Sequence, residues 1–106
     1  MKKIILSIDT SKHDKLIVGL NIDSREVVLE EGFDFRKSQG VLPLIEKILK
    51  QKHVVFSELT EIKVNPGPGS FTGVRVGVAI ANTLGLALQI SINGKKIGQT
   101  VEPVYE

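Results

Sequence analysis

A glycine-rich loop at residues 66–70, Pro-Gly-Pro-Gly-Ser, has the composition of loops that hold phosphate where they lead into a helix. It is not a Walker A motif, because no Gly-Lys-Ser or Gly-Lys-Thr ends it. It is not a Gly-x-Gly-x-x-Gly fingerprint, because Thr72 stands where the third glycine belongs. The prolines make the loop stiff, and Ser70 or Thr72 can cap the helix that follows. These residues favour a stiff start to a helix, with anion binding as the minor alternative.

The helix after this loop carries small residues every four positions, Gly73, Gly77, Ala81 and Gly85. They line one narrow stripe, and each glycine inside a helix costs about 1 kcal/mol relative to alanine. The close approach of another backbone would compensate for this cost. Two interpretations stay open: the stripe packs on the chain's own sheet or first helix, or it forms a groove for a partner. Because the other faces of the helix are mostly apolar, we expect burial on more than one side.

Asp9, Thr10 and Ser11 place a carboxylate and two hydroxyls directly after an apolar run. The simplest interpretation is a turn at the end of a strand. Arg75, just inside the helix, is either solvated or available to a carboxylate or an RNA phosphate. Neither His13 nor His53 is spaced as a metal ligand pair, and we expect no metal site.

A modest basic cluster lies around the first expected helix, and such charges usually solvate a helix rather than contact nucleic acid. Its members are Arg36, Lys37, Lys47, Lys50 and Lys52.

The totals describe an ordinary globular chain of 106 residues, with 42% hydrophobic and 25% charged residues. The formal net charge of +2 is too small to imply a nucleic-acid partner. Without cysteines there is no disulfide framework and no thiolate metal site. No apolar run approaches the ~20 residues of a membrane span, so we expect a cytoplasmic protein without membrane contact.

Hydrophobic periodicity predicts the element order βββαβαβ, which is three hairpin-linked strands followed by two crossover units. We expect the strands at residues 4–8, 16–22, 26–30, 61–65 and 89–93, and the helices at residues 38–52 and 72–88. A further extended segment is expected around residues 101–105. This order indicates a mixed five-stranded sheet with two main helices, an α/β arrangement that resembles the ribonuclease H-like core in each lobe of the actin-like ATPases.

Three stretches resemble one family specifically. They read Ile-Leu-Ser-Ile-Asp-Thr-Ser at residues 5–11, Ser-Gln-Gly-Val-Leu-Pro-Leu-Ile-Glu-Lys-Ile-Leu at residues 38–49, and the segment from Asn65 to Leu88. Together they resemble the TsaB (YeaZ) family of tRNA threonylcarbamoyladenosine biosynthesis. The resemblance covers residues 4 to about 92, and residues 67–77 are its most specific part.

The resemblance implies a non-catalytic scaffold that needs no cofactor. It implies pairing with the catalytic paralogue TsaD, or with a second copy as a homodimer, through helices 38–52 and 72–88. It also implies that a small ATPase, TsaE, joins the complex and that contact with tRNA is indirect. On this basis we expect partner contacts at Leu42, Ile45, Gly73, Arg75, Gly77, Val78, Ala81, Asn82 and Gly85.

The resemblance also places Asp9, Thr10 and Ser11 at the first phosphate-loop position of the actin-like ATPases, where an aspartate helps to position a metal. The alternative function is therefore a nucleotide-binding enzyme lobe or a remnant ATPase. ATP in such proteins is clamped between two lobes, and one lobe offers no opposite wall to exclude water. We accordingly expect no independent ATPase activity.

Family members are usually two-lobed and much longer than this chain. We expect residues 1–106 to form one lobe, without the second, and residues 95–106 to form a C-terminal tail. The motif Val-Glu-Pro-Val-Tyr at residues 101–105 resembles the end of full-length members. One hypothesis is a natural miniature that keeps this closing segment, and the other is a truncated chain.

Overall fold

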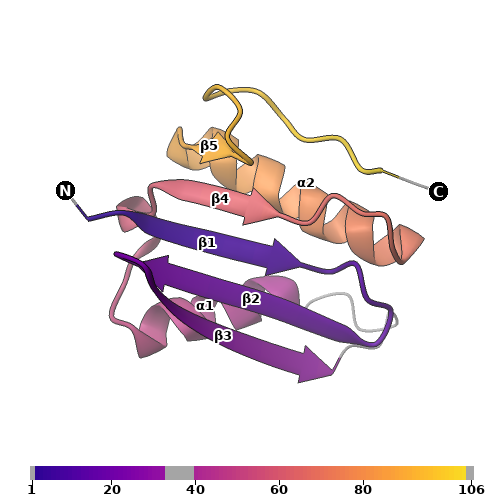
Figure 1. Ribbon diagram of the computed structural model, residues 1–106, viewed down its shortest axis with the longest axis horizontal. Helices are drawn as coiled ribbons and strands as arrows, with labels where there is room; N and C mark the ends of the chain where they lie inside the picture. Colours follow the sequence, from indigo (N-terminus) through magenta and orange to yellow (C-terminus); the bar gives the residue numbers. More distant parts are fainter. Residues whose placement is uncertain (1, 33–39, 105–106) are drawn as a thin grey trace.

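A five-stranded mixed sheet forms the centre of the computed structural model, which describes residues 2–32 and 40–104 (Figure 1). Its strands lie in the order β3-β2-β1-β4-β5. Their bounds are Ile4–Asp9 for β1, Lys15–Ile22 for β2, Arg25–Gly32 for β3, Glu61–Val64 for β4 and Ser91–Ile92 for β5.

The strand directions divide the sheet into two halves. β1 pairs antiparallel with β2, and β2 with β3, as expected of hairpin-linked strands. β4 runs parallel to β1, and β5 parallel to β4, because a helix-containing connection precedes each of them. The carboxyl ends of β1, β4 and β5 therefore meet at one edge, where α/β proteins commonly place a ligand.

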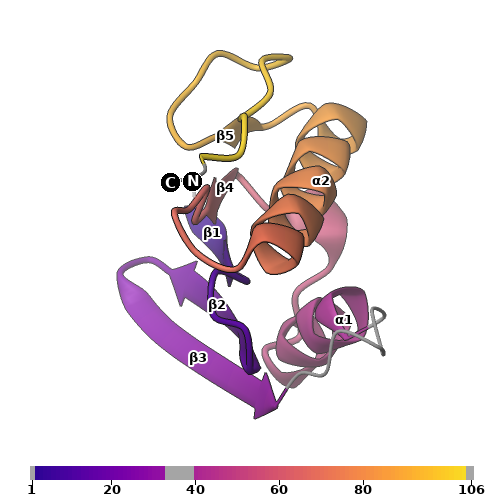
Figure 2. The ribbon, with the colours of Figure 1, turned by 90° about the vertical axis from the view of Figure 1, so that its right-hand side faces the viewer.

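Two helices cover one face of this sheet, α1 at Val41–Gln51 and α2 at Phe71–Leu88 (Figure 2). A short 3-10 helix, η1, spans Phe56–Glu58 between α1 and β4. α1 contacts β2 and β3, whereas α2 contacts β1, β4 and β5. The two helices thus lie side by side over different halves of the sheet.

Alternation along the strands determines which side chains reach the helices. In β1 the side chains of Ile4, Leu6 and Ile8 are buried, while those between them are only partly covered. The register carries the same face onto β2 and β4 through Val18 and Ile62. The apolar core therefore lies between the sheet and the two helices.

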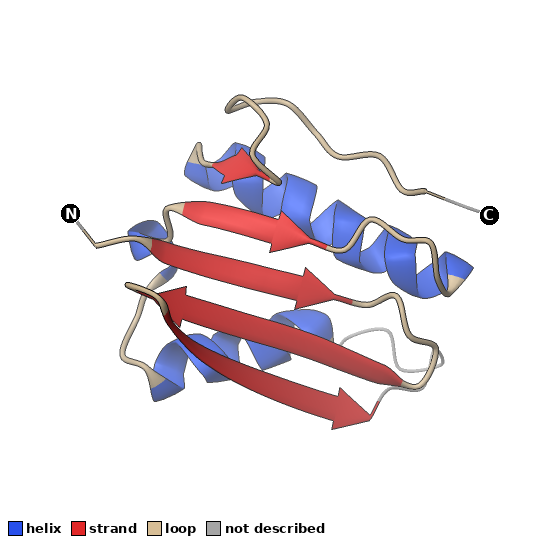
Figure 3. Ribbon diagram, viewed as in Figure 1, coloured by secondary structure: helices blue, strands red, loops and turns tan. Residues whose placement is uncertain are grey.

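The predicted order βββαβαβ is confirmed, with small shifts at the ends of elements (Figure 3). α2 begins one residue before the prediction, at Phe71, and the described part of α1 ends at Gln51. The predicted start of α1 at residues 38–39 lies outside the described residues. Residues 101–104 form no strand.

β5 is shorter than predicted, because the end of α2 limits it on one side and the turn that follows limits it on the other. Gln89 takes a left-handed conformation, with a φ of 56°, as the C-cap of α2. At the other end, the Asn93 side-chain amide exchanges two hydrogen bonds with the backbone of Val64, at 2.8 and 3.0 Å. A side chain thus continues the pairing to β4 where the strand itself has ended.

Candidate functional site

The small-residue stripe of α2 packs on the chain's own sheet, and this corrects the prediction that it forms a groove for a partner. Gly73, Gly77, Ala81 and Gly85 are all buried. A Cβ atom at residue 73 or 77 would collide with Thr10, which follows β1, and one at residue 85 would collide with Ile92 of β5. Glycine is needed at residue 73 because the backbone of Thr10 approaches α2 closely, while residues 77 and 85 leave room for the side chains of Thr10 and Ile92.

Three other predicted partner contacts also belong to the interior of this chain. Val78 is 3% exposed and Ile45 is fully buried, so both are core residues. The Asn82 side-chain amide is bound to the backbone of Val101, as described below. Only Leu42 and Arg75 of the predicted interface residues lie exposed.

An apolar groove lies instead between the outward faces of the two helices. It has a volume of about 220 Å³ and is lined by Leu42 of α1 and by Ala79, Ile80, Thr83 and Leu84 of α2. Leu42 is 44% exposed, and Leu86, farther along α2, is 45% exposed. We refer to this surface as the α1–α2 groove.

The sequence did hold a signal for the α1–α2 groove. α2 is apolar nearly all round, while one sheet can cover only one of its faces. In the structure the glycine-bearing side of α2 packs against the sheet. The larger side chains on its other side therefore point away from the sheet. Glycine is unfavourable inside a helix, and close contacts with Thr10 and Ile92 explain the glycines of the stripe.

Arg75 lies beside Phe71 at the start of α2. Its guanidinium carbon is 5.3 Å from the centre of the Phe71 ring, a cation–π arrangement. Phe71 is 56% exposed, and Arg75 is exposed as well. The pair presents a flat, positively charged surface one helical turn before the α1–α2 groove begins at Ala79.

The predicted cofactor residues Asp9, Thr10 and Ser11 lie together at the end of β1 but are engaged with one another and with α2. Asp9 Oδ1 accepts hydrogen bonds from the backbone nitrogen and the hydroxyl of Ser11, at 2.9 and 2.6 Å. The Asn65 amide nitrogen donates to Ser11 Oγ at 3.2 Å. Thr10 is 1% exposed, and its hydroxyl donates to the carbonyl of Gly73 at 2.5 Å. This is the arrangement of a strand-end turn that anchors a helix.

The charge on Asp9 is stabilised by this network. Partial burial alone would raise the pKa of the Asp9 carboxyl, because it disfavours the charged form. The hydrogen bonds from Ser11 and Asn65, together with the nearby charge of Lys12, outweigh that effect and lower the pKa below its ordinary value. Asp9 is therefore a carboxylate held by its neighbours at neutral pH.

The glycine-rich loop is docked onto the same turn. The backbone nitrogen of Ser70 donates to the carbonyl of Ser11 at 2.7 Å, and a Cβ atom at residue 69 would collide with Ser11. Ser70 is the N-cap of α2, with its hydroxyl accepting from the backbone nitrogen of Gly73 at 3.4 Å. Of the two predicted caps, the structure selects Ser70 rather than Thr72. The loop thus serves as a stiff start to α2.

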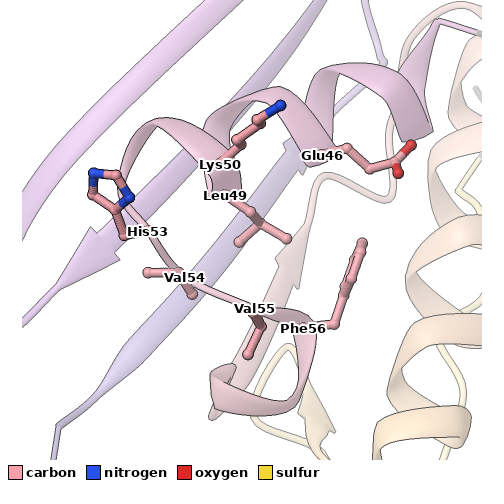
Figure 4. A pocket seen from close by; sticks show the side chains of 7 residues that line it. All are labelled: Glu46, Leu49, Lys50, His53, Val54, Val55 and Phe56. Atoms are coloured by element: carbon pink, nitrogen blue, oxygen red, sulfur yellow. The ribbon is translucent and has the colours of Figure 1, made fainter.

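A surface pocket of about 480 Å³ lies at the far end of α1 (Figure 4). Leu49, Val54 and Phe56 provide apolar walls, while Glu46, Lys50 and His53 stand around the rim. Both signs of charge are present, and His53 takes a φ of 55° in the turn that ends the helix. Nothing in this arrangement selects one ligand.

Two broader features bear on function. Within residues 2–32 and 40–104, no three His, Cys, Asp or Glu side chains gather closely enough to hold a metal ion.

α2 has the length and mean hydropathy, 1.5, of a membrane span, although the sequence predicted none. In the structure it contacts β1, β4 and β5 on one side, and 33% of it is buried.

The three-stranded meander, the two crossovers and the turn after β1 define the class: an α/β fold of the actin-like, ribonuclease H-like type. The family model for TsaD, the tRNA N6-adenosine threonylcarbamoyltransferase, matches residues 36–94. The chain is also similar to the tRNA threonylcarbamoyladenosine biosynthesis protein TsaB of Buchnera aphidicola subsp. Schizaphis graminum, at 35% identity over 89% of this chain and 44% of that protein.

TsaB of Bacillus subtilis is 30% identical over 96% of this chain and 49% of its own length. Among solved structures, YeaZ from Pseudomonas aeruginosa superposes with a TM-score of 0.80 at 29% identity, over 89% of this chain and 44% of that one. The chain belongs to the TsaB (YeaZ) family. It spans about half the length of the curated relatives that it matches.

Proposed function

We propose that this chain is a non-catalytic interaction subunit in the biosynthesis of threonylcarbamoyladenosine in tRNA. It pairs with the transferase subunit TsaD through the α1–α2 groove. The observation that carries the proposal is the groove itself, an apolar surface on the outward side of two adjacent helices. A role in this pathway is supported by the names of the relatives, each of which is a TsaB protein of tRNA threonylcarbamoyladenosine biosynthesis.

The composition of α2 supports a partner on this side. Only 33% of this apolar helix is buried in the isolated chain. Burying a half-exposed leucine or isoleucine contributes on the order of 1 kcal/mol, at about 25 cal/mol per Å² of apolar surface. A partner helix seated between Leu42 and Leu84 would remove Leu42 and the smaller exposed parts of Ile80 and Leu84 from water together, as at the core of an interface.

The match to the TsaD family model supports the choice of partner. The matched residues, 36–94, include both α1 and α2 entirely. A transferase subunit with the same pair of helices would present a similar outward face, so the two could pack as a four-helix arrangement. The same reasoning makes a homodimer the natural competitor, in which a second copy takes the place of the transferase.

Arg75 and Phe71 extend this proposed interface at the start of α2. Their stacked pair is of the kind that contributes strongly at interfaces, where arginine and aromatic residues are enriched. Recruitment of the ATPase TsaE, indirect contact with tRNA and a cytoplasmic location complete the proposal.

The alternative is a nucleotide-binding lobe centred on Asp9. The position of Asp9 at the carboxyl end of β1 favours nucleotide binding. Against it, Asp9 Oδ1 and the hydroxyls of Thr10 and Ser11 are already engaged with one another, with Asn65 or with Gly73. We therefore assign this cluster the structural role of anchoring α2.

Two measurements on the purified chain separate these functions. Size-exclusion chromatography with light scattering, after mixing with the TsaD subunit, should give a one-to-one complex. Calorimetric titration of Mg-ATP into the chain alone should give no binding isotherm in the micromolar range. Failure to co-elute, together with micromolar ATP binding, would contradict the interaction role and support the nucleotide-binding one.

A further inference from the structure

Residues 101–104, which we call the returning segment, dock back onto the domain. After β5 the chain loops away from the sheet and comes back along α2 towards the loop between β4 and α2 (Figure 1). Along the returning segment, Val101 is buried, Glu102 is exposed, Pro103 is half-buried and Val104 is exposed. This alternation is typical of an extended strand with one face against a protein surface.

The first attachment is a two-way hydrogen-bonded pair between Val101 and Asn82. The Val101 backbone nitrogen donates to Asn82 Oδ1 at 2.8 Å, and Asn82 Nδ2 donates to the Val101 carbonyl at 3.0 Å. A side-chain amide thus satisfies both backbone groups of one residue, as a neighbouring strand does in a sheet. The Val101 side chain is 5% exposed and joins the apolar core. Backbone recognition and an apolar anchor therefore act on the same residue.

The second attachment lies at the glycine-rich loop. The Val104 backbone nitrogen donates to the Pro66 carbonyl at 2.7 Å. Gly67 has a φ of 102°, and a Cβ atom there would collide with the carbonyl of Val104. Glycine at residue 67 thus leaves room for the returning segment as well as permitting the turn.

The connection between β5 and the returning segment adds little to this attachment. Residues 93–100 are all exposed. Beyond Asn93, the backbone bonds of this stretch are local ones, from Lys95 to Ile92 and from Gln99 to Lys96. The returning segment is therefore held by its own contacts with Asn82 and Pro66 rather than by a packed connection.

We propose that Asn82, Pro66 and the apolar socket of Val101 form a binding site for an extended peptide, which the returning segment fills in cis. The ligand class is an extended chain with an apolar residue two positions before a proline. Backbone bonds supply most of the recognition, as in peptides that add to a sheet edge, and the Val101 socket supplies the side-chain preference. This site lies apart from the α1–α2 groove, on the β5 side of α2.

Peptide addition to a variant of the 106-residue chain tests this site directly. In Val101→Asp, a buried charge expels the returning segment while every residue of the binding site is kept. A synthetic peptide of residues 98–104, with blocked ends, should bind this variant saturably and shift the NMR signals of the Asn82 side-chain amide. The same peptide carrying aspartate at position 101 is the matched control, and it should not bind. Absence of binding to a folded Val101→Asp variant would overturn the proposal.

Hydrogen exchange in the otherwise unchanged chain provides a measurement that does not depend on that variant folding. The amides of Val101 and Val104 should both be protected, and Asn82→Ala should speed their exchange together by about tenfold, with Leu6 in β1 unaffected. Exchange at Val101 as fast as in the free peptide would refute the proposal. So would a variant in which Val104 keeps its full protection, because the two attachments would then not form one site.

Discussion

The side chain of Thr10 occupies the space that a Cβ atom at residue 77 would need, and its hydroxyl donates to the carbonyl of Gly73 at 2.5 Å. The turn after β1 is thereby locked into the first two turns of α2. Two glycines that resemble a helix-pairing motif in the sequence instead leave space for one buried threonine. The α1–α2 groove on the other side of α2 is the surface that we propose for a partner.

Gly77→Ala should destabilise the fold, although alanine favours a helix by about 1 kcal/mol over glycine. The added methyl group collides with a threonine that cannot move without losing its hydrogen bond. Overpacking of a core costs about 1–3 kcal/mol, so after the gain in helix propensity a net loss of up to about 2 kcal/mol is expected. Urea denaturation followed by circular dichroism measures it.

The partner variant Thr10→Ala identifies the cause. Alone it should cost about 1 kcal/mol, through the lost hydrogen bond. In the double variant the methyl group at residue 77 gains the space of the missing hydroxyl. The double variant should then lose at least about 1 kcal/mol less stability than the sum of the losses of the two single variants. Strict additivity would mean that Thr10 and Gly77 do not share this space.

Acid should weaken the fold partly through Asp9. Its pKa is lowered in the folded state, so its ionised form contributes stability at pH values above the unfolded-state pKa, near 4. That contribution should be lost as the pH falls from about 5 through 4 to below the folded-state pKa. In Asp9→Asn, the free energy of unfolding should therefore fall less steeply over the same interval.

Ser11→Ala tests the source of this effect. The Ser11 hydroxyl donates to Asp9 at 2.6 Å and helps to lower its pKa. Without it the folded-state pKa should move upward, and NMR titration of the Asp9 carboxyl carbon should report the change. An unchanged titration midpoint would assign the lowered pKa to other neighbours of Asp9.

Ser70→Ala should destabilise α2, whereas Thr72→Ala should not. Ser70 is the N-cap, and its loss costs about 0.5–2 kcal/mol in general. The bond to the Gly73 nitrogen is long, at 3.4 Å, so a value near the lower end is expected. Thr72 is exposed within the first turn and serves as the matched control. Equal losses in thermal unfolding would contradict the assignment of the cap.

The fold could be predicted from the sequence because its signals are local. Apolar runs such as residues 4–8 predicted strands, and the stripe of Leu44, Ile45 and Ile48 predicted α1. The end of β5 was not predictable in the same way. There the Asn93 side chain replaces a strand residue, and this depends on Val64, far away in the sequence.

The candidate site was harder to predict, because it depends on which face of α2 meets the sheet. Periodicity showed that Gly77 and Ala81 share a face, but not whether that face is covered by Thr10 or by a partner. Likewise, Asn82 looked available until the structure paired it with Val101. Contacts between residues distant in the sequence decide which face of α2 is covered and what binds Asn82. Such contacts cannot be predicted from a local sequence pattern.

The affinity of two matched variants for the TsaD subunit tests the proposed interface most directly. Leu42→Glu puts a charge into the α1–α2 groove, and Val28→Glu puts one on the opposite sheet face, at similar exposures of 44% and 49%. Both should stay folded, since each side chain is half in solvent and an acidic residue suits the first turn of α1. In calorimetry, Leu42→Glu should weaken binding by at least about a hundredfold, while Val28→Glu should bind like the unchanged chain. Unchanged binding by a folded Leu42→Glu variant would contradict pairing through the α1–α2 groove.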